Sequence, residues 1–421
     1  VASVALGVAL LRNGLPLLWQ IGLSCAFLFL ACLALHAALY RARPEPQRLT
    51  HFYLLVSLGG ALGGALVNFA APALLDGYWE LLLGWFAAAA LLALAGARCP
   101  DPALSPRTRA RLNLFGATLT AAVALVSVTL WNVLSSDDRW RGRNFYGVLR
   151  VREEPSRGLR SLVHGMTTHG IELLDPARRR EPTAYFWRDS GIGRVMASLP
   201  RPAGRRQVGI LGMGIGVLAA YGETGDRFRY YEIDPGCIEL ARGRGGWFHF
   251  VSESRARVET VPGDARLSLE RERRDAGPGQ LDLLVVDVFS SDAIPVHLLT
   301  REAFGVYLEH LAPGGALLFH ISNRHLELAP VLAAQARDLG LSAWEWIDAR
   351  SDQDVERGIF GSHWVLMAPS QVLEGIEGAL GGGGPEAQAV EHHRLAIGVL
   401  QSGRPGVHEL LGDGEVFLAQ L

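Results

Sequence analysis

The fold of this chain is decided by the stretch from Gln207 to Leu218, QVGILGMGIGVL. A short apolar run ends in three alternate glycines, Gly212, Gly214 and Gly216, and a helical pattern follows. This pattern is typical of a buried parallel strand that turns into a helix beneath a nucleoside, because glycine lets the backbone approach the ligand and the helix N-terminus offers free N–H groups. One glycine-rich turn alone is weak evidence for nucleotide binding.

Acidic residues stand at the ends of three later strand-like runs. Glu232 follows the glycine turn by about twenty residues, and a carboxylate at that place can accept both hydroxyls of a ribose. Asp264 follows Gly263 at the end of the next run, where it can meet an adenine amino group. Asp287 ends the run from 281 to 287. Each of these groups supplies a different part of one nucleoside site, so together they predict such a site more strongly than the turn alone.

Strands and helices are predicted to alternate from 206 to about 369, which favours a parallel, doubly wound sheet. The predicted strands are 207–212, 228–233, 257–261, 281–287, 315–321, 341–347 and 362–368. Ligands of such sheets bind outside the carboxyl ends of the strands. The predicted domains are a helical part (1–135), a small β-rich part (136–200), a Rossmann-like domain (201–370) and a tail (371–421).

Four long apolar stretches precede the β-rich part, at 15–40, 52–74, 78–97 and 113–134. A membrane span needs roughly 20 apolar residues, so we predict an α-helical transmembrane bundle of four helices, with part of a fifth in 1–11. The alternative is a set of buried helices in a large soluble core. Such helices seldom reach this length without charges.

The sidedness of the bundle is predicted from two opposing arguments. Arginine-rich loops at 41–48 and 98–111 outnumber the arginines after the last helix by seven to four (Arg12 counted with the second group), and the positive-inside rule then places the C-terminal part outside the cytoplasm. An enzyme that needs nucleosides requires the cytosolic pool. We therefore expect an integral protein of the cell membrane with a cytoplasmic catalytic domain.

Composition excludes several classes of function. The net charge is −2, so no overall field attracts nucleic acid. All 40 basic residues are arginine, which rules out Schiff-base and P-loop lysine chemistry. The four cysteines are scattered, and Glu391-His392-His393 has no partners at metal-ligand spacing, so neither a disulfide framework nor a metal site is predicted.

The catalytic part resembles spermidine synthase-like proteins, in particular their membrane-fused bacterial branch. The matching stretches are 143–147 (RNFYG), 162–165 (LVHG), 169–170 (HG), 189–193 (DSGIG), the turn at 212–216, 231–235 (YEIDP), 263–266 (GDAR), 287–295 (DVFSSDAIP) and 320–324 (HISNR). The resemblance covers about residues 50–368, and the run from 287 to 300 is its most specific part.

The resemblance implies a small β domain followed by a class I methyltransferase-like domain. Its co-substrate would be decarboxylated S-adenosylmethionine or S-adenosylmethionine, with no metal, and its other partner a small-molecule amine. The implied donor-binding residues are Gly212, Gly214, Gly216, Glu232 for the ribose, Asp264 for the adenine, and Ala265. The implied acceptor-side residues are the catalytic Asp287 and Asp292, beneath a loop at 288–300, and the substrate-binding His164, Tyr185 and Asp189.

Two positions depart from the pattern of soluble aminopropyltransferases. Ile215 stands where their glycine turn carries an acid, and the Leu-Asp-Gly…Gln pattern of their β domain reads Val163-His164-Gly165…Thr168. Methyl transfer or lyase cleavage of S-adenosylmethionine is therefore an open alternative to aminopropyl transfer. A non-catalytic nucleoside sensor or a transporter regulatory domain is another.

Structural roles are the alternatives at single positions. Glu232 could be an ordinary strand-end acid, Asp287 a helix cap and Asp292 a loop-stabilising residue. His164, His169 and His320 could be hydrogen-bonded structural histidines. Three tryptophans of the late strands are expected in the core or in a homodimer contact: Trp344, Trp346 and Trp364.

Overall fold

The structure is a computed structural model that describes residues 17–98, 105–135, 137–165, 167–276, 280–288, 294–323, 326–380 and 393–394. The chain divides into two compact units, one up to Val148 and one from Leu149. The domain boundaries predicted at 136, 201 and 371 stay predictions.

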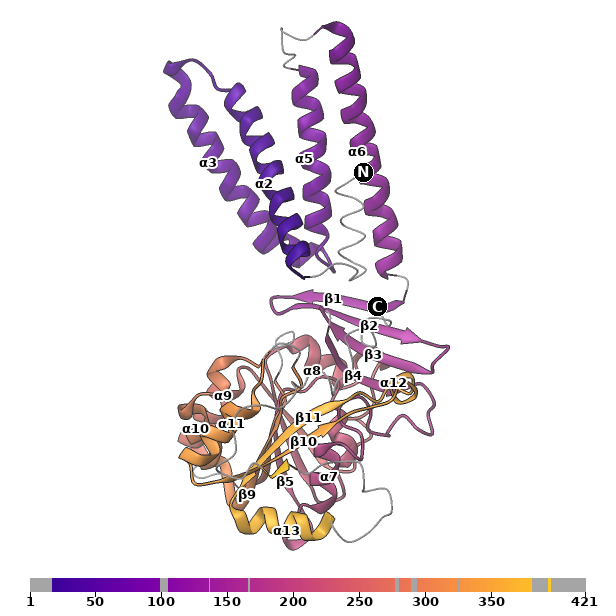
Figure 1. The fold of residues 1–421 in the computed structure, drawn as a ribbon, viewed down its shortest axis with the longest axis vertical. Coiled ribbons are helices and arrows are strands. Elements are labelled where there is room, and N and C mark those ends of the chain that lie inside the picture. The colour runs from indigo at the N-terminus through magenta and orange to yellow at the C-terminus, as the bar shows by residue number, and fades with distance from the viewer. Residues whose placement is uncertain are drawn as a thin grey trace. The chain divides into compact units, whose positions relative to one another are not determined.

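The first unit consists mainly of long helices (Figure 1), and each of the four predicted apolar stretches forms one. They are α2 (Leu17–Arg41), α3 (Leu49–Ala65) with α4 (Ala71–Leu74), α5 (Trp79–Arg98) and α6 (Pro106–Ser135). The turn η1 (Pro46–Arg48) precedes α3, the π-helical turn η2 (Leu66–Ala70) joins α3 to α4, and the strand β1 (Asp138–Asn144) follows α6. Helix α5 packs against both α2 and α6.

One helical run in the described part of the chain, Pro46–Leu74, is long and apolar enough to cross a bilayer, which is weak evidence by itself. Its large apolar side chains are exposed, Phe69 by 77% and Leu54 by 64%. Exposed apolar surface of this extent marks a membrane or a partner surface in a stable protein. The predicted spanning role of α2, α5 and α6 stays a prediction.

An arginine–carboxylate pair joins β1 to the start of α5 within the first unit. Arg143 donates from Nη1 and Nη2 to the two oxygens of Glu80, each at 2.8 Å, and from Nη1 to the carbonyl of Gly77 at 2.8 Å. Its guanidinium also lies 4.7 Å from the ring centroid of Tyr78. The side chains of Arg143 and Glu80 are only 8% and 19% exposed. The bidentate pairing offsets the free-energy cost of burying the two charges.

The second unit contains a small antiparallel sheet of β2 (Gly147–Glu154), β3 (Leu159–His164) and β4 (Thr167–Leu173). Leu149 pairs with His164, and His164 pairs with Thr167. These strands lie within the part of the chain predicted to be β-rich. The small sheet thereby carries His164 and His169 on adjacent strands.

The large sheet has the order β12-β10-β11-β9-β8-β5-β6-β7. Its strands are β5 (Gln207–Leu211), β6 (Arg227–Glu232), β7 (Arg257–Pro262), β8 (Leu281–Val286), β9 (Leu311–His320), β10 (Ser342–Asp348), β11 (Ser362–Ala368) and β12 (His393–Arg394). The seven predicted strands are all present within a few residues of the expected bounds. The order β7-β6-β5-β8-β9, with β11 reversed beside β9, supports the class I methyltransferase-like fold that the resemblance implies.

The predicted all-parallel sheet is wrong in one respect, because β11 runs antiparallel to both β9 and β10. The connection from β10 to β11 holds only the short helix α12 (Asp352–Glu356). A parallel pair needs a crossover connection over the sheet, whereas an antiparallel pair can be joined directly. The sheet is therefore mixed.

Helices cover both faces of the large sheet, as the doubly wound prediction requires. On one face α9 (Ala265–Ala276), α10 (Arg301–His310) and α11 (Ala329–Asp338) enclose the apolar core (Figure 1). On the other face α7 (Gly191–Ser198) packs against β10 and β11, and α13 (Ser370–Leu380) packs on α7. Trp346 and Trp364 are fully buried in the core of this unit.

Side-chain caps set the starts of three helices. Ser190 accepts from the N–H of Gly193 at α7, and Thr300 accepts from the N–H of Ala303 at α10. Asp234 accepts from the N–H of Gly236 at α8 (Pro235–Ala241). These caps satisfy backbone donors that a helix leaves unpaired at its N-terminus.

The glycine turn is packed against other parts of the protein. Gly212 has a φ of 88°, and a Cβ built on it would overlap the carbonyl oxygen of Asp287. Gly214 has a φ of 52°, and its Cβ would overlap the carbonyl oxygen of His169. Both positions thus require glycine for conformation and for space.

We expect Gly212→Ala to destabilise the protein by about 3 kcal/mol or more, because it adds a positive-φ strain to a backbone overlap. Gly305→Ala is the matched control. A Cβ on Gly305, within α10, meets nothing within 4 Å, and alanine there should be neutral or stabilising by up to about 1 kcal/mol. Thermal unfolding of the purified full chain measures both changes, and equal melting temperatures for Gly212→Ala and the wild type would contradict this account.

Candidate active site

Backbone hydrogen bonds bring the predicted site residues to one edge of the large sheet. The N–H of Gly212 donates to the carbonyl of Tyr231 at 2.8 Å, and the N–H of Asp287 donates to the carbonyl of Leu211 at 2.9 Å. The N–H of Gly263 donates to the carbonyl of Glu232 at 2.8 Å. The tips of β5, β6, β7 and β8 are therefore in register, and this is the carboxyl edge where ligands of such sheets bind.

The helical pattern after the glycine turn forms only the short 3-10 segment η4 (Val217–Tyr221). Gly216 precedes it in a left-handed conformation, with a φ of 78°. The predicted α-helix at this place is thus wrong, because the left-handed residue and the short segment do not build an α-helical N-terminus. This turn therefore does not form an anion-binding site from the N–H groups of a helix N-terminus.

The carboxylate of Glu232 is fixed by two backbone donors. Its Oε2 accepts from the N–H of Met213 at 2.9 Å and its Oε1 from the N–H of Asp234 at 2.8 Å. Burial is the main influence on this group and raises the pKa of Glu232 to about 7. Each oxygen retains a second lone pair, so a bound molecule can still donate to both.

Asp264 has a structural and a solvent-facing oxygen. Its Oδ1 accepts from the N–H of Leu267 at 2.9 Å, which caps α9, and its Oδ2 lies 3.2 Å from Nε2 of His297. His297 is half exposed, so this second contact is at the surface. Ala265 packs in the apolar core with 7% exposure, and its predicted role in donor binding stays a prediction.

Asp287 belongs to a chain of short hydrogen bonds. Its Oδ1 lies 2.7 Å from Nδ1 of His320, and Nε2 of His320 lies 2.7 Å from Oγ of Ser322. The same Oγ accepts from the N–H of His363 at 2.9 Å. The His320 ring stacks on Trp364 with centroids 4.3 Å apart.

The sequence marked His320 only as part of the run 320–324 and as a possible structural histidine, and it did not single out Ser322 or Trp364 as site residues. A signal was present, because His320 and Ser322 are two residues apart at a strand end, and such residues point to the same side. The partner Asp287 is 33 residues away along the chain, so only the sheet order brings it to His320.

Tyr185, which the resemblance implies to bind substrate, lies beside His320, and its predicted role stays a prediction. Its ring centroid is 5.2 Å from that of His320 and 5.3 Å from that of Phe360. The preceding Ala184 is buried and has a φ of 51°, unusual for a residue with a side chain. Its N–H donates to Gly358 at 2.7 Å and its carbonyl accepts from Phe360 at 3.1 Å. Two hydrogen bonds therefore hold a strained backbone that fixes Tyr185.

His164 lies beside His169, which contacts the glycine turn. Its ring centroid is 5.6 Å from that of His169, and the backbone of His169 contacts Gly214. Asp189 is exposed in the turn before α7, where its carbonyl accepts from Arg194 at 2.8 Å. The predicted roles of His164 and Asp189 in substrate binding stay predictions, and Asp292 lies outside the described residues.

Ile215 is fully buried and packs against the small sheet. A Cβ on Gly170 would lie 2.5 Å from Cγ1 of Ile215. The departure from the aminopropyltransferase pattern at this position is therefore a core contact. An acid at this place would be buried next to β4.

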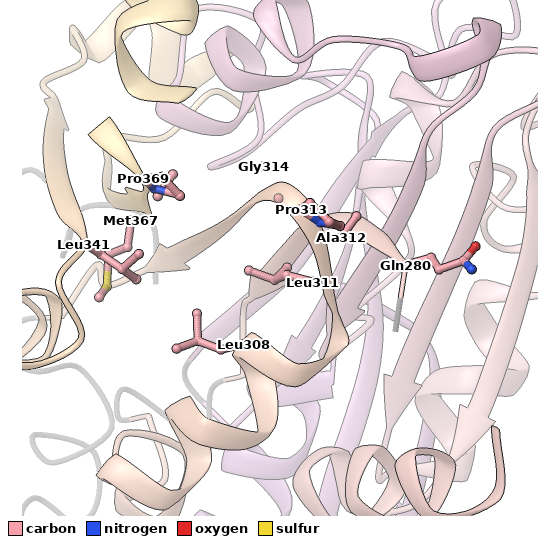
Figure 2. A pocket seen from close by; sticks show the side chains of 11 residues that line it. Gln280, Leu308, Leu311, Ala312, Pro313, Gly314, Leu341, Met367 and Pro369 are labelled. Carbon is pink, nitrogen blue, oxygen red and sulfur yellow. The ribbon is translucent and has the colours of Figure 1, made fainter. Parts of the chain in front are cut away.

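An apolar hollow lies at the other end of the large sheet (Figure 2), next to the starts of β8 and β9. Its lining includes Leu308, Leu311, Leu341 and Met367, and none of its lining residues is charged. Because it is at the amino ends of the parallel strands, it is separate from the carboxylate site. Within the described residues, no group of three or more His, Cys, Asp or Glu side chains could hold a metal ion.

No family model and no curated protein matches this chain. Solved structures similar to it include spermidine synthases, the family that its motifs resemble. A probable spermidine synthase from Corynebacterium glutamicum is 19% identical with a TM-score of 0.41, over 58% of this chain and 88% of that chain. The spermidine synthase from Thermotoga maritima is 15% identical with a TM-score of 0.39, over 55% and 72%.

Methyltransferases are also among the similar structures. Human methyltransferase-like protein 13, in complex with SAH, is 18% identical with a TM-score of 0.33, over 47% of this chain and 94% of that chain. The likeness to the membrane-fused branch stays a prediction.

We expect Glu232 to make stability depend on pH. Its pKa is about 7 in the folded protein against 4.5 as the ordinary value, so the unfolded chain loses this proton first as pH rises. The free energy of unfolding should therefore fall between pH 4.5 and 7, by at most about 3 kcal/mol, and then level off.

Glu232→Gln should remove this contribution, and chemical denaturation of the full chain at pH 5 and pH 8 measures it. Burial also raises the pKa of Glu172 and of Asp348, but both residues are present in wild type and variant, so the difference isolates Glu232. The same loss of stability from pH 5 to pH 8 in both proteins would refute the expectation.

Proposed function

We propose that this chain is a transferase that uses an adenosyl sulfonium donor, decarboxylated S-adenosylmethionine or S-adenosylmethionine, and that with the decarboxylated donor it passes an aminopropyl group to an amine. The observation that carries the proposal is the alignment of Gly212, Glu232, Asp264 and Asp287 at neighbouring strand tips of one sheet edge. Three carboxylates at one edge suit a ligand with a ribose, an adenine and a cationic reacting end.

The ribose would bind at Glu232. The two backbone donors hold the carboxylate in one orientation, and the remaining lone pairs accept the two ribose hydroxyls. The next residue, Ile233, is 41% exposed and offers an apolar surface to a base. Asp264, at the tip of the neighbouring strand β7, would accept the adenine amino group at Oδ2, the oxygen that does not cap α9.

The acceptor amine would bind at Asp287, which is 16% exposed. The nitrogen attacks the carbon beside the sulfonium, the N–C bond forms as the C–S bond breaks, and a neutral thioether leaves. The carboxylate first attracts the cationic acceptor and takes a proton from its nitrogen, because only the neutral amine has the lone pair that attacks. Most of the rate would come from holding nitrogen, carbon and sulfur in line.

Methyl transfer or lyase cleavage of intact S-adenosylmethionine is the second candidate, and the buried Ile215 favours it. Aminopropyltransferases of the resembled pattern place an acid at this position to contact the cationic propylamine. Here the side chain is apolar and packed against Gly170. A donor that keeps its own carboxylate needs no acid at this place.

The membrane is proposed as the site of action. The apolar helix Pro46–Leu74 would anchor the chain in the cell membrane, with α2, α5 and α6 as further spans. The catalytic part would face the cytoplasm, where the donor and the amine are available.

We expect calorimetric titration of the purified full chain to show binding of an adenosyl sulfonium donor. Product analysis with each donor, with and without a short diamine such as putrescine, then separates aminopropyl transfer from methyl transfer and from lysis. Binding of neither donor would refute the proposal. A preference for the intact donor would select the second candidate.

Asp287→Asn should lower turnover by a factor of about 100 to 10,000, because the amide cannot take the proton. Donor affinity should change by less than about threefold, since Asp287 is on the acceptor side. Steady-state kinetics and calorimetry of the variant measure the two effects. Unchanged turnover would remove Asp287 from the mechanism.

A further inference from the structure

The structure assigns a positioning role to His320, which holds Asp287 for its reaction with the acceptor, while Ser322 fixes the tautomer of the His320 ring. This inference rests on the proposed function, since it concerns the base of that reaction.

The partners of the His320 ring decide its tautomer. Oδ1 of Asp287 lies 2.7 Å from Nδ1, and two lone pairs facing each other at that distance would repel, so Nδ1 carries the hydrogen. In a neutral ring with its hydrogen on Nδ1, Nε2 is an acceptor, so the Ser322 hydroxyl at 2.7 Å donates to Nε2 while its Oγ accepts from the N–H of His363. Donors and acceptors then match along the whole chain from His363 to Asp287.

Burial restricts His320 to acting through Asp287. Its side chain is 3% exposed, one face stacks on the fully buried Trp364, and Tyr185 lies 5.2 Å away between ring centroids. Asp287, at 16% exposure, is the member of the pair that reaches solvent. The histidine thus fixes one carboxylate oxygen and leaves the rest of the group for the amine.

The order Asp–His–Ser also occurs in acyl-transfer enzymes, where the serine attacks. The described contacts favour the positioning role. The Ser322 oxygen accepts a backbone N–H, and the ring that would activate it is stacked within the core. The open end of the chain is the carboxylate, so substrate chemistry is expected there.

The variants His320→Asn and His320→Gln test the roles of the two ring nitrogens separately. In His320→Asn the amide nitrogen falls near the place of Nδ1 and can still donate to Asp287, whereas in His320→Gln it falls near Nε2 and cannot. We expect His320→Asn to keep kcat within about fivefold. His320→Gln should lower kcat by about 100-fold, with KM and donor affinity little changed, because misplacement of a reacting group by about 1 Å costs this much.

His310→Gln is the matched control for the loss of a buried histidine. His310 is 5% exposed on α10, bonds to the carbonyl of Val306, and precedes the start of β9, while His320 is at the end of that strand. Its replacement should lower the melting temperature and leave kcat of the folded protein unchanged. A fall in kcat for His310→Gln equal to that of His320→Gln would show that both effects are structural.

A double variant tests whether His320 acts through Asp287. If it does, Asp287→Asn with His320→Gln should be no slower than Asp287→Asn alone, because the second change has nothing left to position. Additive losses in the double variant would overturn the positioning role alone. Full activity of His320→Gln would do the same, provided that the wild type turns over. Absence of turnover in the wild type with either donor would instead overturn the proposed function, and the positioning role with it.

Nitrogen-15 NMR of histidine-labelled full chain gives a readout that does not depend on activity. A signal of a ring protonated at Nδ1 should be missing in His320→Gln and shifted in Asp287→Ala. A ring protonated only at Nε2 would overturn the assigned tautomer and the positioning role.

Discussion

The arrangement of the site depends on one close approach, between Gly212 and the carbonyl oxygen of Asp287. This contact leaves no room for a Cβ, and the neighbouring hydrogen bonds from Gly212 to Tyr231 and from Asp287 to Leu211 lock the tip of β5 to strands on both sides. Because β5 is central, the positions of Glu232 and Asp287 follow from that lock. Gly212 matters because it allows the tip of β5 to approach Asp287 this closely. The turn itself leads only into a short 3-10 segment and starts no α-helix.

The two carboxylates nearest this lock are held in different ways. Backbone N–H groups fix Glu232, whose desolvation raises its pKa to about 7, while a side chain fixes Asp287. Backbone donors cannot leave, so Glu232 suits a binding role in which geometry must not change. The partner of Asp287 is a side chain, so a single substitution can remove it.

Much of this organisation could be predicted from the sequence, because apolar runs and turn residues mark strands locally. All seven strands and the acids at Glu232, Asp264 and Asp287 were placed in this way. The direction of β11 could not be, since an apolar run is the same pattern in either direction and only the short connection through α12 decides it. The partners of Asp287 also depend on contacts between distant strands, and the burial of Ile215 depends on Gly170 of the small sheet. The predicted helix after the turn failed because Gly216 adopts a left-handed conformation.

The place of β11 has a consequence for biosynthesis. This strand is inserted between β9 and β10 although it follows both in the chain, and it supplies the N–H of His363 and the ring of Trp364, which contact the residues that hold the Asp287 carboxylate. A nascent chain that has left the ribosome only as far as β10 lacks these groups, and its β9 has an open edge that can pair with other chains. Until β11 has been translated, the growing polypeptide therefore lacks the partners that hold the Asp287 carboxylate and exposes a strand edge that favours aggregation.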